Sequence, residues 1–150
     1  MFSFLFPSTT LQKADFEDVK YAIQNPSKIF LINTMSSLEQ DVLIQQSVHS
    51  RDEEKVINNL LNNFSFEIKD ISIIIYGKNA NDITIETKYH QFKKLGFQHV
   101  YIYYGGMFEW ALLNELYGTD EFPTTQKIRD ILKFKSSNSA IAFKYKMLKY

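Results

Sequence analysis

The stretch VYIYYGGMFEW at residues 100–110 decides the fold that we expect. Its first five residues are apolar or aromatic, and such a run is typical of a β-strand buried on both faces. The pair Gly105-Gly106 then turns the chain into a helix over residues 108–116, which carries Trp110 and which Gly118 ends. A buried strand that leads directly into a helix is the repeating unit of a parallel sheet.

Similar units lie upstream of this stretch. Apolar runs predict two further buried strands and one short strand, at residues 28–33, 70–76 and 42–44. Helical spacing of apolar side chains predicts three helices, over residues 15–24, 50–64 and 82–95. Asp15 and Ser50 are expected as N-caps of the first two, and Gly96 as the end of the third. We therefore expect an α/β fold, with a central, mostly parallel sheet and helices on both faces.

The composition is that of a single folded domain. The chain has 150 residues, of which 45% are hydrophobic and 23% are charged. A chain of this size buries enough surface to fold without a disulfide or a metal. The 17 basic and 17 acidic residues cancel, and there is no cysteine. A disulfide framework, a cysteine metal site and a cysteine nucleophile are therefore excluded.

Nothing in the sequence predicts a membrane span or a secretion signal. No stretch reaches the roughly 18 apolar residues that a span needs. Residues 1–7 are apolar, but they are too short for a signal peptide and lack its basic residues. We expect them to form a strand or a segment packed on the core, and the protein to stay in the cytosol. The excess of residues with AT-rich codons indicates an AT-rich genome.

The C-terminal residues differ in character from the rest. We expect residues 1–118 to form the domain and residues 119–150 to form an extension, with a short helix over residues 125–134. Residues 133–150 carry five lysines and no acid. Because the whole chain is neutral, the remaining 132 residues carry a net charge of −5.

The last eleven residues alternate. Ile141, Phe143, Tyr145 and Met147 lie on one side of an extended chain, and lysines lie on the other. This period of two predicts a strand over residues 140–150, which would have to pair with a sheet edge or with another chain.

Four pieces of the sequence resemble a rhodanese-like domain. They are IFLIN at residues 29–33, IIYG at 74–77, LGF at 95–97 and VYIYYGG at 100–106. In that family one strand ends in (L/I)IDVR, the active loop reads YCxxGxRS, the next helix ends in LGF, and a strand leads to GG…W. The resemblance covers residues 9–118 and implies the rhodanese-like fold. The ending through residues 121–125 is similar to rhodanese-like proteins of large DNA viruses and protists, so the host cytoplasm or a virion is a further possible location.

The resemblance also implies a degenerate active site. The family's reaction needs a cysteine thiolate at the start of the loop, held by backbone N–H groups and the N-terminus of the next helix. Here the loop consists of Gly77, Lys78, Asn79, Ala80, Asn81 and Asp82. One alignment places Gly77 at the cysteine, Ala80 at the loop glycine and Asp82 at the loop arginine. A slipped alignment places Ala80 at the cysteine, and an alanine there could also stand for a replaced cysteine.

Other charged positions of the family are also lost. The aspartate and arginine of the DVR motif become Asn33 and Met35. We expect Asp82 to cap the following helix itself and to repel an incoming anion. His49, His90 and His99 lie far apart in the sequence and lack the spacing of metal ligands.

These residues predict a protein without sulfurtransferase activity, catalytic residue, metal or cofactor. We expect an interaction or structural module with an unknown protein partner, which could be a second copy of the chain bound through the C-terminal segment. Two alternatives stay open. One is an enzyme of another kind that uses the retained cleft, and the other is a binder of nucleic acid or an acidic surface through the basic tail.

Overall fold

The computed structural model describes residues 10–63, 67–137 and 140–148. The segment of residues 1–7, expected as a strand or packed segment, lies outside them. Four parallel strands form one sheet in the order β2-β1-β3-β4. They are β1 (Ile29–Asn33), β2 (Ser47–Val48), β3 (Ser72–Tyr76) and β4 (His99–Tyr103). The predicted parallel sheet and its three longer strands are therefore confirmed.

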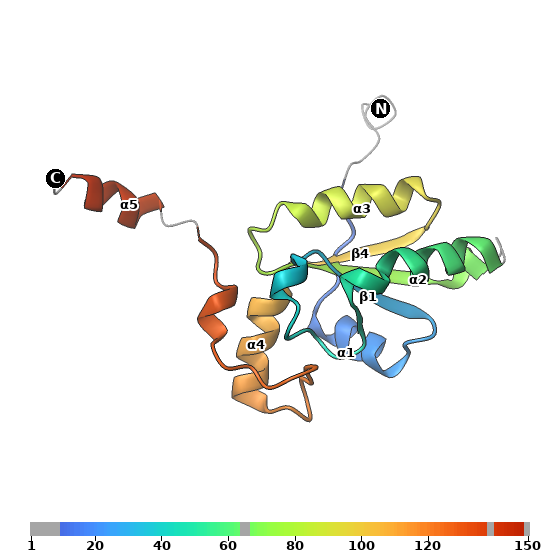
Figure 1. Cartoon of the computed structure of the whole chain (residues 1–150), viewed down its shortest axis with the longest axis horizontal. Coiled ribbons are helices and arrows are strands. Elements are labelled where there is room, and N and C mark those ends of the chain that lie inside the picture. Colours follow the sequence, from blue (N-terminus) through green and yellow to red (C-terminus); the bar gives the residue numbers. More distant parts are fainter. Residues whose placement is uncertain (1–9, 64–66, 138–139, 149–150) are drawn as a thin grey trace.

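Helices cover both faces of the sheet, as predicted (Figure 1). They are α1 (Phe16–Gln24), α2 (Ser50–Asn63), α3 (Thr84–Lys94) and α4 (Gly106–Tyr117), followed by the separate α5 (Ala140–Met147). Short 3-10 turns are η2 (Ser37–Glu39), η3 (Glu67–Asp70) and η4 (Ile131–Phe134). No helix of the described residues is both long and apolar enough to cross a lipid bilayer.

The core has two halves, one on each face of the sheet. Ile57 of α2 packs with Ile85, Tyr89 and Phe92 of α3 on one face. On the other face α1 and α4 pack together with Phe122 and Phe134 of the C-terminal extension. The extension therefore completes the core on the α1 and α4 side.

Two local predictions before β3 are wrong. Residues 42–44 form no strand, because Ile44 makes only an isolated antiparallel bridge to Thr124. The segment that pairs with β1 begins three residues after Ile44, at β2. Helix α2 begins at Ser50 itself, so Ser50 is not its N-cap. The ring Nδ1 of His49 accepts the Arg51 N–H at 3.2 Å instead.

The helix expected over residues 125–134 is also mostly absent. Only η4 is helical there, and Asp130 caps it by accepting the Leu132 N–H at 3.0 Å. The preceding residues run along the body, where Leu43 N–H donates to Thr125 Oγ1 and Thr125 N–H donates to the Leu43 carbonyl. These contacts with the body fix an extended path that helical spacing does not reveal.

The strand predicted for residues 140–150 is wrong, because Ala140–Met147 form helix α5. A strand needs an edge to pair with, and the β4 edge is already taken by residues 12–14, which hydrogen-bond to Ile102. At the opposite edge β2 has only two residues. A helix satisfies its backbone hydrogen bonds internally, and α5 projects away from the body (Figure 1).

Candidate active-site loop

The loop after β3 lies at the carboxyl ends of the strands, where ligands bind in open α/β sheets. The double glycine after β4 holds it in place. Met107 N–H donates to the Gly77 carbonyl and Phe108 N–H donates to the Lys78 carbonyl, both at 2.9 Å. Gly106 has φ +64°, and a Cβ there would lie 2.6 Å from the Gly77 carbonyl oxygen. A side chain at Gly106 would therefore push the loop away.

The Asp82 carboxylate turns back into this loop. Its Oδ2 accepts the Lys78 N–H at 3.2 Å and the Thr34 hydroxyl at 3.4 Å. Its Oδ1 accepts the Thr84 N–H at 3.0 Å and the Thr84 hydroxyl at 2.5 Å. Helix α3 begins at Thr84 and its N-cap is Ile83, which makes no side-chain capping bond, so Asp82 is not the N-cap. The Asp82 carboxylate instead lies one residue earlier and binds the first N–H group of the helix.

The carboxylate also takes space that a side chain at residue 77 would need. A Cβ on Gly77 would collide with Asp82 Oδ2 and would lie 3.0 Å from the Ile85 side chain. Ala80, the cysteine position of the slipped alignment, is exposed. Whichever alignment applies, the position holds glycine or alanine, and neither can attack sulfur.

The side chain of Lys78 forms an ion pair with an acidic residue of the same chain. Its Nζ lies 2.8 Å from Glu39 Oε2. The hydrogen bond from Lys78 lowers the pKa of Glu39, and Ser36 adds to the effect. The positive charge of the loop is therefore paired within the chain.

The C-terminal extension is tied to the same loop. Asn79 Nδ2 donates to the Phe134 carbonyl at 3.0 Å, and Asn81 Nδ2 donates to Ser136 Oγ at 2.7 Å. Between the loop and residues 135–137 remains a polar hollow of about 280 Å³. Because Phe134 is only 1% exposed, the tie is anchored in the core.

The two substituted family positions pack into the structure. Asn33 is buried, donates to the Val48 carbonyl at 3.0 Å and accepts the Met35 N–H at 3.2 Å. It therefore joins the end of β1 to β2. The Met35 side chain is buried in the core on the α1 and α4 side.

The three histidines are not brought together into a site. His90 and His99 are exposed, and His49 binds the start of α2. The described residues contain no group of three metal-ligating side chains.

Sequence reasoning missed several residues of the loop's surroundings. Thr34, Thr84 and Glu39 bind its charged groups, and Phe134 anchors the extension beside it. Thr84 had a local signal, because an aspartate two residues before a threonine favours a turn in which the carboxylate accepts the N–H. The other three are brought to the loop by tertiary packing.

Comparisons with known proteins agree with this fold. The pattern of the rhodanese-like domain matches residues 15–113. The BH2092 protein of Bacillus halodurans superposes with a TM-score of 0.52 at 17% identity, over 69% of this chain and 73% of that one. The Alr3790 protein of Anabaena sp. superposes with a TM-score of 0.51 at 16% identity, over 91% of each chain. No curated protein matches the chain.

The family match covers the strands, the first three helices and most of α4, and it ends before the extension. The residue that carries sulfur in the family's reaction is absent, because the chain has no cysteine. The chain belongs to the rhodanese-like domain family, in a form that lacks the catalytic cysteine.

Proposed function

We propose that this rhodanese-like chain is not an enzyme and acts as an interaction or structural module. The observation that carries the proposal is the Asp82 carboxylate, which accepts four hydrogen bonds around the loop. An anionic substrate would have to displace a negative charge already bound to the same donors. In the family the transferred sulfur is held by backbone N–H groups of this loop and by the N-terminus of the next helix.

The missing thiolate supports the same conclusion. Sulfur transfer through the family's persulfide requires a nucleophilic sulfur in the loop, and no side chain of this sequence supplies one. The polar side chains of Lys78, Asn79 and Asn81 are bound by Glu39, Phe134 and Ser136. An enzyme of another kind would have to work in the polar hollow beside them.

The C-terminal helix is the element best suited to bind a partner. Four large apolar side chains on α5 are 60–74% exposed: Ile141, Phe143, Tyr145 and Met147. Single exposed apolar residues are common, but several on one short helix favour contact with another protein. The net charge of +5 on residues 133–150 complements the −5 of the other residues, so a second copy of the chain is a suitable partner.

The positive charge of residues 133–150 makes nucleic acid the second candidate partner. Lys144 and Lys146 lie among exposed aromatic side chains, a combination that binds nucleic acids. The net charge of −5 on the rest of the chain would repel phosphates, and for this reason we favour a protein partner.

The test of the proposal is sulfur transfer from thiosulfate to cyanide by the pure full chain. A cysteine-containing member of the family serves as the positive control. We expect no thiocyanate above the rate in buffer, because there is no thiolate to carry the sulfur. Turnover that scales with the protein concentration and survives repeated purification would overturn the proposal.

A further inference from the structure

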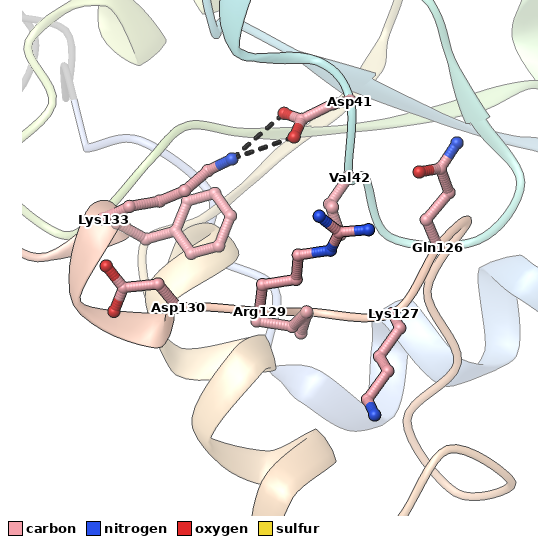
Figure 2. Close-up of a pocket in the computed structure, with 9 residues that line it drawn as sticks. Asp41, Val42, Gln126, Lys127, Arg129, Asp130 and Lys133 are labelled. Atoms are coloured by element: carbon pink, nitrogen blue, oxygen red, sulfur yellow. Dashed lines mark hydrogen bonds and ion pairs between the residues drawn. The ribbon is translucent and has the colours of Figure 1, made fainter.

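A second cavity lies where the C-terminal extension crosses the segment before β2 (Figure 2). Its volume is about 320 Å³. Asp41 and Val42 form one wall, and residues 126–130, 133 and 134 form the other. The second wall lies outside residues 15–113, so the family pattern does not account for this cavity.

Most charged groups in the cavity are already bound. Lys133 Nζ contacts both carboxylate oxygens of Asp41 at 3.1 Å, and this bond lowers the pKa of Asp41. Asp130 accepts the Leu132 N–H at the start of η4. Arg129 has no ion pair or side-chain hydrogen bond with the described residues.

The Arg129 side chain points into the cavity. Figure 2 shows its guanidinium reaching toward the segment of Val42, on the same side as the Gln126 amide, while Lys127 projects the other way. Arg129 is one of only two arginines in a chain with fifteen lysines. A guanidinium presents paired N–H donors in a plane, and a carboxylate accepts them through both oxygens.

The walls restrict the kind of anion that fits. Asp41 and Asp130 line the same cavity as Arg129, so a row of phosphates would face two carboxylates as well as the arginine. A single carboxylate carries less negative charge and is repelled less by these two acids. The half-buried Ile128 and the small exposed part of Val42 supply apolar surface for the stem that carries it.

We propose that this cavity binds a carboxylate on an apolar stem, namely a glutamate side chain in a segment of a partner protein. The inference rests on the proposed role as an interaction module and names what that module recognises. Arg129 forms the paired hydrogen bonds, the Gln126 amide donates a further one, and Val42 and Ile128 contact the stem. The Asp41–Lys133 pair keeps the extension in place, so the cavity is preformed.

The test is an NMR titration of the full ¹⁵N-labelled chain with N-acetyl-glutamate amide, and separately with a peptide that carries the same residue between two leucines. N-acetyl-glutamine amide is the matched probe that lacks the carboxylate. Inorganic phosphate is the probe that carries a different anion. We expect saturable shifts of the Arg129 Nε–H and of residues 126–134 with both glutamate probes, and tighter binding of the peptide. If only the blocked amino acid binds, the source is a small carboxylic acid and the protein-segment proposal is wrong.

Three variants make the test specific. Arg129→Gln should abolish the saturable shifts, and Arg129→Lys should bind more weakly than the natural chain because it loses the paired geometry. Lys127→Gln removes an equal charge that points away, so its dissociation constant should stay within about twofold. Equal weakening by Arg129→Gln and Lys127→Gln, equal shifts with the glutamine probe, or saturable binding of phosphate alone would each overturn the proposal.

This outcome is separate from that of the proposed function. Sulfur transfer by the chain would refute the module and leave carboxylate binding at Arg129 intact. A chain that shows neither turnover nor saturable shifts would agree with the proposed module and would refute carboxylate binding in the cavity.

Discussion

A side chain on Gly77 would collide with the Asp82 carboxylate. Gly77 is where one alignment places the family's cysteine, and Asp82 holds the hydrogen-bond donors around it. In its present position the Asp82 carboxylate therefore leaves no room for a side chain at residue 77, and so none for a cysteine there.

This relationship predicts non-additive effects on stability. Gly77→Cys should lower the free energy of unfolding by about 1–3 kcal/mol, because it overpacks the loop. Asp82→Ala removes the obstacle, so Gly77→Cys should cost less in the Asp82→Ala background than in the natural chain. Urea denaturation of the four chains gives the coupling, and strictly additive effects would show that the collision is relieved in another way.

Ala80→Cys is the matched control at the other aligned position. Ala80 is exposed, so the change should alter the free energy of unfolding by less than about 0.5 kcal/mol. We expect no stable persulfide after treatment with thiosulfate, because the nearby Asp82 carboxylate disfavours a thiolate. A strong persulfide signal in mass spectrometry would support the slipped alignment and show that the loop still stabilises sulfur.

Trp110 should dominate the stability of the core on the α1 and α4 side. It is fully buried, its ring packs edge-on against Tyr103 and Phe122, and its Nε1–H donates to the Pro123 carbonyl at 3.0 Å. Trp110→Ala should cost about 3–5 kcal/mol. Trp110→Phe keeps much of the apolar contact and should cost clearly less. A urea midpoint that hardly moves in Trp110→Ala would contradict the observed packing.

Two truncations separate the packed part of the extension from α5. A chain ending at Ser137 loses α5 but keeps Phe122 and Phe134 in the core, so its stability at low concentration should match that of the full chain. A chain ending at Gly118 loses both aromatic residues and should be much less stable.

Sedimentation at several concentrations tests the partner suggested for α5. We expect the full chain to form dimers at concentrations where the chain ending at Ser137 stays monomeric. If the two chains sediment alike and only salt-sensitive binding to DNA or RNA is lost, the tail binds nucleic acid instead.

Acid should release the extension. The hydrogen bonds from Lys78 and Lys133 lower the pKa values of Glu39 and Asp41 from the ordinary 4.5 and 3.8. A carboxylate with a lowered folded pKa adds stability above its unfolded pKa and loses it as pH falls through the folded value. We expect the protection factors of the amides of residues 126–135, which correct for the pH dependence of intrinsic exchange, to fall as the pH drops below about 4.

Carboxyl-carbon NMR provides the control for this pH effect. The pKa of Asp41 should rise toward its ordinary value in Lys133→Gln, while that of Glu39 should change little. Identical titration of Asp41 in both chains would show that Lys133 does not hold it.

The sequence predicted the elements whose residues set their own geometry. Short stretches of sequence predicted the β-branched strand β3, the N-cap Asp15 of α1 and the helix end at Gly96. The structure shows all three, with a capping box at Asp15 and φ +105° at Gly96. The wrong predictions fall where partners distant in sequence decide. Residues 140–150 alternate like a strand, yet both sheet edges are taken or too short, and Ala140–Met147 form a helix.

The candidate site was predictable in part. That Asp82 would bind the start of the next helix followed from its position, and the absence of a nucleophile followed from composition. The tie from Asn79 to the Phe134 carbonyl spans 55 residues and depends on how the extension packs, which no local pattern reveals.

The central claim is that the Lys78 and Thr84 N–H groups are bound by Asp82 and are closed to an anion. Titration of the ¹⁵N-labelled chain with thiosulfate tests it most directly, with the Lys78 and Thr84 amide signals as reporters, because both N–H groups donate to Asp82. We predict no saturable shift of either signal in the natural chain, and saturable shifts of both in Asp82→Ala. Saturable binding of thiosulfate at Lys78 and Thr84 in the natural chain would contradict the account.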